Sequence, residues 1–201
     1  MKGRLSKLDM INAMRESKAQ FPSLAVVVFT GGEATLLKAD LIDAIAEATA
    51  LGLATRVVTN GSWGKVPDRA RHMAGRMAQA GLSEINLSSG KDHQEWVPHT
   101  SVVNAAEAAF DAGISTLITV EADTADGRSL RTFVEDPTIR ALMSDGLRLQ
   151  SNSWMEFKRT DDKRSHVLST AIRVEPCEQV HRNIVITPYR EVAACCGLTL
   201  E

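Results

Sequence analysis

The chain has no cysteine before Cys177, no long hydrophobic run and no large excess of charge of either sign. Its 23 basic and 25 acidic side chains give a net charge of −2, which argues against nucleic acid as the main partner, because phosphate binding favours a basic surplus. The longest apolar run, Leu24 to Phe29, is far shorter than the roughly 20 residues that span a bilayer. The first part of the chain lacks the apolar segment of a secretory signal. We therefore expect a cytoplasmic protein with one main domain and no membrane or nucleic-acid partner.

A repeated junction, glycine followed by leucine or isoleucine, organises the sequence. Its copies begin at Gly52, Gly81, Gly113 and Gly146, separated by 29, 32 and 33 residues. Each glycine follows a segment with helical spacing and stands where a helix commonly ends in a left-handed residue. Each is followed by a run of strand composition, which an all-helical repeat would leave unexplained. Helix–strand units of about 30 residues predict an α/β fold with parallel strands and crossover helices.

The predicted strands are adjacent in chain order, and they cover residues 24–29, 54–59, 84–88, 115–121 and 147–152. The first is apolar on both faces, which predicts an interior strand with a neighbour on each side. A capping box from Ser6 to Asp9 predicts a helix that ends near Lys18. Because no strand precedes this helix, we expect a sheet that lacks its first strand. The bare edge of residues 24–29 then favours self-association.

The C-terminal part of the sequence departs from the repeat. Residues 158–166 are polar and charged, which indicates a solvated connection. Residues 183–195 predict a small hairpin that turns at Pro188 and Tyr189. We therefore divide the chain into a main domain, residues 1–157, and a C-terminal hairpin extension, residues 158–201.

Polar segments, three of them rich in glycine, follow the predicted strands. They comprise residues 30–35, 59–64, 88–93, 121–123 and 151–154. Ligands of parallel α/β folds bind beyond the carboxyl ends of the strands. We therefore expect one shared binding site at this edge of the sheet.

Three of these segments resemble motifs of the radical S-adenosylmethionine (SAM) superfamily: Phe29-Thr-Gly-Gly-Glu-Ala, Val58-Thr-Asn-Gly and Leu87-Ser-Ser-Gly, in this order. The resemblance covers about residues 5–155. It implies a partial parallel (β/α) barrel, a radical SAM-type enzyme core and SAM as a cofactor. It also implies that the Gly-Gly-Glu turn holds the methionine amino group, and it assigns the SAM site to Gly31, Gly32, Glu33, Asn60 and Ser88.

The chemistry of these residues agrees with the assignment. An ammonium group needs acceptors, and Glu33 offers a carboxylate for a charge-assisted hydrogen bond. Gly31 and Gly32 permit close approach of a ligand to the backbone. The alternative is that Glu33 caps the following helix near its positive end, while Asn60 and Ser88 only form turns at the ends of strands.

The sequence departs from the superfamily pattern in two ways. Ala34 replaces the usual proline of the first motif. The superfamily also binds a [4Fe–4S] cluster through a Cys-x3-Cys-x2-Cys loop after its first strand, and this loop is absent. We expect the missing strand and the missing loop to lie upstream of Met1.

We therefore expect the SAM-binding part of a longer [4Fe–4S]-dependent enzyme, inactive alone, whose substrate the sequence does not reveal. One alternative is a relative without a cluster, a non-catalytic module that binds a nucleotide or SAM. Another is a (β/α) enzyme unrelated to SAM.

The three cysteines form a second group of candidates. Cys177, Cys195 and Cys196 resemble the ligands of auxiliary iron–sulfur clusters in some radical SAM enzymes, with a fourth ligand beyond Glu201. A zinc site that includes His181 and three thiols without a metal are the alternatives.

Three other side chains lie in segments that follow strands. His93 and His99 flank Trp96 and Pro98 in the loop after the strand that contains Ser88, and Glu121 ends its strand. Each is a candidate for contact with a substrate, and a solvated surface role is the alternative for the histidines.

Overall fold

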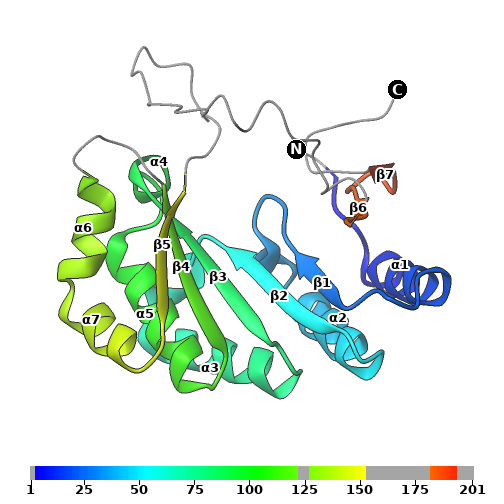
Figure 1. The fold of residues 1–201 in the computed structure, drawn as a ribbon, viewed down its shortest axis with the longest axis horizontal. Coiled ribbons are helices and arrows are strands. Elements are labelled where there is room, and N and C mark those ends of the chain that lie inside the picture. Colours follow the sequence, from blue (N-terminus) through cyan, green and yellow to red (C-terminus); the bar gives the residue numbers. More distant parts are fainter. Residues whose placement is uncertain (1–2, 122–126, 153–181, 194–201) are drawn as a thin grey trace, which may run out of the picture. The chain divides into compact units, whose positions relative to one another are not determined.

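The computed structural model describes residues 3–121, 127–152 and 182–193. They belong to two compact units, one of residues 24–165 and one of residues 1–23 with 166–201. The larger unit contains a five-stranded parallel sheet in the order β1-β2-β3-β4-β5 (Figure 1). The strands are β1 (Val26–Phe29), β2 (Ala54–Thr59), β3 (Glu84–Ser89), β4 (Ser115–Glu121) and β5 (Arg148–Asn152). The predicted α/β class, parallel pairing and chain-order adjacency are confirmed.

Helical segments connect the strands of the larger unit. They are η1 (Ala34–Leu37), α2 (Ala39–Ala50), η2 (Ser62–Lys65), α3 (Pro67–Gln79), α4 (Lys91–Gln94), α5 (His99–Asp111), α6 (Arg128–Glu135) and α7 (Pro137–Ser144). Crossovers between parallel strands have the same hand, so successive strands place their helices on one face of the sheet. Figure 1 shows this helical layer, and α5 packs against both α3 and α7. The four junction glycines all have positive φ and follow helices, as predicted.

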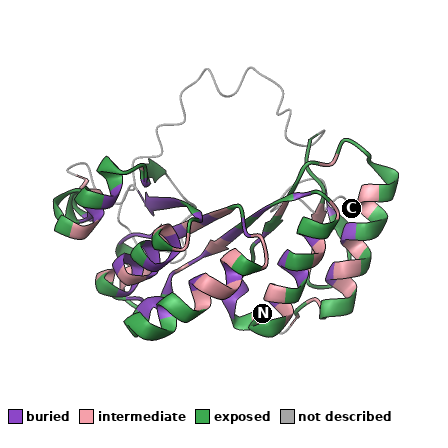
Figure 2. Ribbon diagram, turned by 90° about the horizontal axis from the view of Figure 1, so that it is seen from below, coloured by how far each residue is buried: buried purple, intermediate pink, exposed green. Residues whose placement is uncertain are grey.

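The hydrophobic core lies between the helices and this face of the sheet. Figure 2 shows the buried sides of the helices turned towards the strands. The largest fully buried apolar side chains are Leu41, Ile45, Val57, Met77, Ile85, Leu87, Val102, Ile118, Val120, Phe133 and Ile139. Strand β4 is the most buried strand, because only its first residue is exposed. The other face of the sheet carries polar side chains such as Asn86, Thr119 and Gln150, which lie next to the candidate site.

Strand β1 lies at an edge of the sheet within the described residues. It pairs only with β2, and the side chains of Val26 and Val28 are 48% and 45% exposed. The second neighbour predicted from its apolar composition is therefore not among the described residues. Self-association through this edge stays a prediction. No helix in the described segments is long and apolar enough to cross a membrane.

The smaller unit contains α1 (Lys7–Gln20) and a hairpin of β6 (Val185–Ile186) and β7 (Val192–Ala193). The predicted capping box is present, because Ser6 and Asp9 exchange side-chain and backbone hydrogen bonds. The predicted hairpin is also present. The Arg190 guanidinium lies 3.1 Å from the Asp9 carboxylate and links the hairpin to α1. The predicted domain boundary at residues 157 and 158 lies outside the described residues.

Candidate functional site

The turn after β1 contains Gly31 and Gly32, and both are exposed. A Cβ atom added to either residue would meet no atom within 4 Å, and Gly31 has a φ of +118°. Within the described part of the chain, no hydrogen bond reaches the carbonyl oxygen of either glycine. The turn therefore offers open space and unused carbonyl acceptors at the carboxyl end of β1.

The carboxylate of Glu33 fastens this turn to the end of β2. Its Oε1 accepts hydrogen bonds from the Thr35 amide (3.1 Å), the Thr35 hydroxyl (2.5 Å) and the Thr59 hydroxyl (2.6 Å). Its Oε2 accepts from the Asn60 amide (2.8 Å). A carboxylate has about four acceptor positions, so these bonds use most of its capacity. Glu33 is also the N-cap of η1, which agrees with the capping alternative.

Asn60 follows β2 and is half-buried. Its Oδ1 accepts a hydrogen bond from the Ser62 amide at 2.9 Å, which shapes the turn into η2. Its side-chain NH₂ donates to no described residue. Asn60 therefore forms the turn and keeps two donors that suit a carboxylate ligand.

Ser88 lies on the polar face of the sheet, beside Thr119 of β4 in the register. It is half-buried, and its hydroxyl bonds to no residue of the described segments. Next to it runs a chain of hydrogen bonds in which Gln150 donates to Thr119 (3.1 Å) and Thr119 donates to Asn86 (2.8 Å). These polar side chains extend the candidate site from the edge of the sheet onto this face.

Glu121 ends β4 and is almost completely buried, with 1% of its surface exposed. Gly90, which follows β3, makes room for it, because a Cβ atom on Gly90 would lie 2.5 Å from the Cβ of Glu121 and 3.0 Å from its Oε2. The glycine of the Ser-Ser-Gly segment therefore permits a buried carboxylate at the carboxyl edge of the sheet.

A cluster of two arginines around one glutamate lies towards the amino ends of the strands, and the sequence did not indicate it. The Glu84 carboxylate lies 2.5 Å from the Arg56 Nε and 2.7 Å from an Arg148 nitrogen. The three residues come from β2, β3 and β5. The pairing of β2 with β3 places Arg56 opposite Glu84, so a correct alignment of these two strands would have predicted that ion pair. The contact with Arg148 forms only when β5 joins the sheet.

The two candidate histidines have different surroundings. Burial lowers the pKa of His93, and the neighbouring Asp92 carboxylate opposes that shift. His99 stacks on Phe133, with 4.3 Å between ring centroids, and its Nε2 lies 3.0 Å from an Asp136 oxygen. His99 therefore joins α5 to the connection between α6 and α7. Trp96, which lies between the histidines in the sequence, is 81% exposed.

Asp136 should make the stability of this helical layer depend on pH. Burial would raise the pKa of its carboxyl group, but hydrogen bonds from His99 and from the Ile139 and Thr138 amides outweigh burial and lower the pKa. The resulting stability is present at neutral pH and is lost as the pH falls through the lowered pKa. We expect Asp136→Asn to be less stable than wild type at pH 7, and the difference to shrink below about pH 4.

Urea unfolding at pH 7, 5 and 3 measures this difference. Asp145→Asn at the other end of α7 is the matched control, because Asp145 is exposed. A difference between wild type and Asp136→Asn that stays constant from pH 7 to pH 3 would contradict the assignment.

The remaining candidate ligands lie elsewhere. Cys177, Cys195, Cys196 and His181 lie outside the described residues. Within the described ranges, no group of three histidine, cysteine, aspartate or glutamate residues is placed to hold a metal ion. The iron–sulfur and zinc hypotheses therefore stay predictions.

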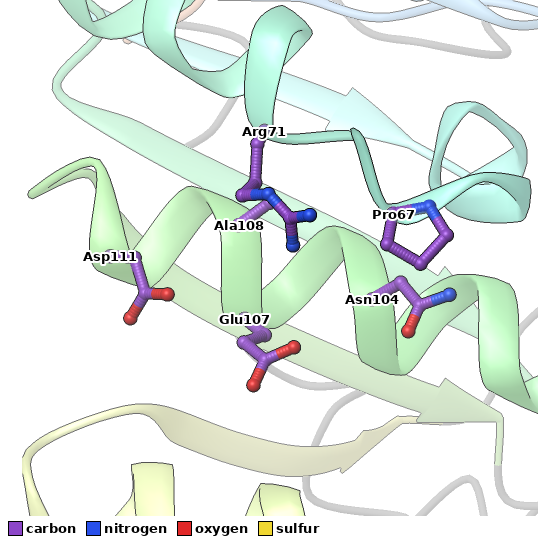
Figure 3. A pocket seen from close by; sticks show the side chains of 6 residues that line it. All are labelled: Pro67, Arg71, Asn104, Glu107, Ala108 and Asp111. Carbon is purple, nitrogen blue, oxygen red and sulfur yellow. The ribbon is translucent and has the colours of Figure 1, made fainter. Parts of the chain in front are cut away.

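A small notch lies between α3 and α5 (Figure 3). Its volume is about 10 Å³, which is roughly the space of one water molecule. Its lining includes Arg71, Asn104 and Glu107. The notch is too small for an organic ligand.

No protein-family model matches the chain, and no curated protein is significantly similar to it. The motifs and the geometry of the strand ends therefore carry the functional argument.

Proposed function

We propose that the carboxyl edge of the sheet is the SAM-binding site of a radical SAM-type enzyme core, and that the five strands are part of a (β/α) barrel. The observation that carries this proposal is the exposed Gly31–Gly32 turn, whose carbonyl oxygens accept no hydrogen bond from described residues. An ammonium group needs several acceptors in a small space, and a turn without side chains supplies them.

Each residue of the site has a distinct role in the proposal. The carbonyl groups of Gly31 and Gly32 bind the methionine ammonium group. Glu33 acts through the four hydrogen bonds that hold the turn against β2, and it is a positioning residue. The free side-chain NH₂ of Asn60 binds the methionine carboxylate, and the Ser88 hydroxyl binds the ribose.

The described residues bind and orient SAM. A bound [4Fe–4S] cluster supplies the electron that cleaves SAM in the superfamily. The described residues of this chain offer no ligand group for such a cluster. The described residues therefore do not fit the cluster, and their part is limited to SAM itself.

We expect the chain to bind SAM weakly and to release no 5′-deoxyadenosine when dithionite is added. We expect weak binding because the described residues supply no site for an iron ion that could chelate the methionine amine and carboxylate. Titration with SAM to millimolar concentration, followed by amide NMR, should shift the signals of Gly31, Gly32, Asn60 and Ser88. Release of deoxyadenosine by this chain above the buffer background would contradict the expectation.

Matched serine variants make this experiment specific. Ser88→Ala should weaken the SAM-dependent shifts, whereas Ser115→Ala, at the amino end of β4, should leave them unchanged. Saturating SAM that shifts none of the four signals would overturn the proposed function. Shifts of the same signals by ATP at lower concentration would favour the nucleotide-binding module instead.

A further inference from the structure

A groove of about 650 Å³ lies between η1, η2 and α3, outside the residues assigned to SAM. We call it the basic groove and define it by its four cationic residues, Lys38, Lys65, Arg69 and Arg76. Its volume falls in the range of small-molecule sites, which is about 300–1,000 Å³. All of its lining residues belong to the larger unit.

The positive charges of the basic groove are not neutralised by carboxylates in its lining. The lining contains one carboxylate, Asp68, and this carboxylate pairs with Arg71, which does not line the groove. None of the four cations forms an ion pair or a side-chain hydrogen bond with a residue in the described parts of the chain. Unpaired cations that converge on one hollow attract a polyanion.

Helical spacing brings part of this charge into a row. Arg69, His72, Met73 and Arg76 stand at positions i, i+3, i+4 and i+7 of α3 and therefore share one face of the helix. Seven residues of helix span about 10 Å, so the two arginines can contact separate phosphate groups of one ligand. Guanidinium groups bind phosphate through two parallel hydrogen bonds.

The backbone conformation of Lys38 is a second, independent indication that the groove is a functional site. Lys38 joins η1 to α2 with a φ of +55° and a ψ of −118°, angles that favour glycine. Residues with strained backbone conformations cluster at ligand-binding sites and other functional sites.

The groove also has apolar lining. Val66 is 42% exposed, Met73 is half-buried, and Trp63 is half-buried and packs against the core. A ligand that matches both features carries several phosphate groups joined to an apolar, flat group. The net charge of −2 disfavours a long nucleic acid.

From these observations we infer that the basic groove is a second binding site, which takes a nucleoside polyphosphate. The phosphates contact Arg69, Arg76 and Lys38, and the base or ribose lies against Val66 and Met73. This site does not depend on the proposed SAM site, although Thr35 lines the groove and also hydrogen-bonds to Glu33.

Titration calorimetry with ATP, without divalent metal and at low salt, tests the inference. Arg76→Glu should raise the dissociation constant about tenfold or more, because it replaces a phosphate contact by repulsion. Arg140→Glu is the matched control, because it makes the same charge change at an exposed arginine of α7, outside the groove. It should change the dissociation constant by less than about twofold.

Lys38→Gly separates binding from folding. It removes a cation and relieves the backbone strain, so thermal stability should rise while ATP affinity falls. Loss of ATP affinity together with a higher melting temperature supports the inference, because misfolding would lower both.

Four outcomes would overturn it. They are no binding of ATP to the wild-type chain, an equal effect of Arg140→Glu and Arg76→Glu, inorganic triphosphate binding as tightly as ATP, and a single-stranded oligonucleotide binding more tightly than ATP. The third outcome would indicate a site for phosphate alone, and the fourth would indicate a nucleic-acid surface. Failure of SAM to bind leaves this experiment unaffected, so the two proposals fail separately.

Discussion

Replacing Gly64 with alanine is expected to lower the free energy of unfolding by at least about 3 kcal/mol. Gly64 lies in η2, where the added Cβ would be 2.0 Å from the carbonyl oxygen of Ser101 and 2.8 Å from the amide nitrogen of Ala105. Both contacts are with the backbone of α5, which cannot move aside as a side chain does. Ser101 and Ala105 are themselves buried, so α5 is held in place. The substitution must therefore separate η2 from α5 and break the hydrogen bond from Asn104 to the Gly64 carbonyl.

Gly75→Ala is the matched control for this prediction. Gly75 lies inside α3, and a Cβ atom there would meet nothing within 4 Å. Alanine in a helix interior is favoured over glycine by about 0.5–1 kcal/mol, so this variant should be slightly more stable than wild type. Thermal unfolding should show a melting temperature lower by about 6–12 °C for Gly64→Ala and unchanged or higher for Gly75→Ala. Equal melting temperatures for the two variants would contradict the packing of η2 on α5.

The strands and their order were predictable because their signals are local. Each unit ends its helix at a glycine and begins a β-branched run soon afterwards, and the structure places a positive φ at all four junctions. Parallel pairing then follows from the length of the crossovers. The position of β1 was less predictable, because an apolar strand such as residues 24–29 suits the interior of a sheet, whereas within the described residues it has one neighbour.

The candidate site was predictable only in part. The turn at Gly31 and Gly32 was visible as a motif, but the four donors around Glu33 were not, because Thr59 and Asn60 reach it only after β1 and β2 pair. The same limit applies to the basic groove, since Lys38 and Arg76 are brought together by packing and share no sequence pattern. A net charge of −2 correctly describes the whole chain and conceals this local excess of positive charge.

Glu33→Gln should destabilise the chain by about 1.5–3 kcal/mol, because the carboxylate accepts hydrogen bonds through both of its oxygens. An amide keeps one acceptor oxygen and brings an NH₂ group. If its oxygen faces the threonine hydroxyls, the NH₂ meets the amide N–H of Asn60. If it is turned over, the NH₂ meets the amide N–H of Thr35. Either orientation leaves a partly buried donor facing another donor.

A double-mutant cycle with Thr59→Val tests whether the network acts as a unit. Thr59→Val removes one hydroxyl at nearly constant volume and should cost about 1 kcal/mol. The hydroxyl and the carboxylate are in direct contact. The loss of unfolding free energy in the double variant, measured with urea, should therefore differ from the sum of the two single losses by about 0.5 kcal/mol or more. Thr132→Val, at an exposed position of α6, provides an additive control, since Thr132 bonds only to the backbone of its own helix. Strict additivity of Glu33→Gln with Thr59→Val would show that the carboxylate does not join β1 to β2. The positioning role of Glu33 in the proposed SAM site would then fail with it.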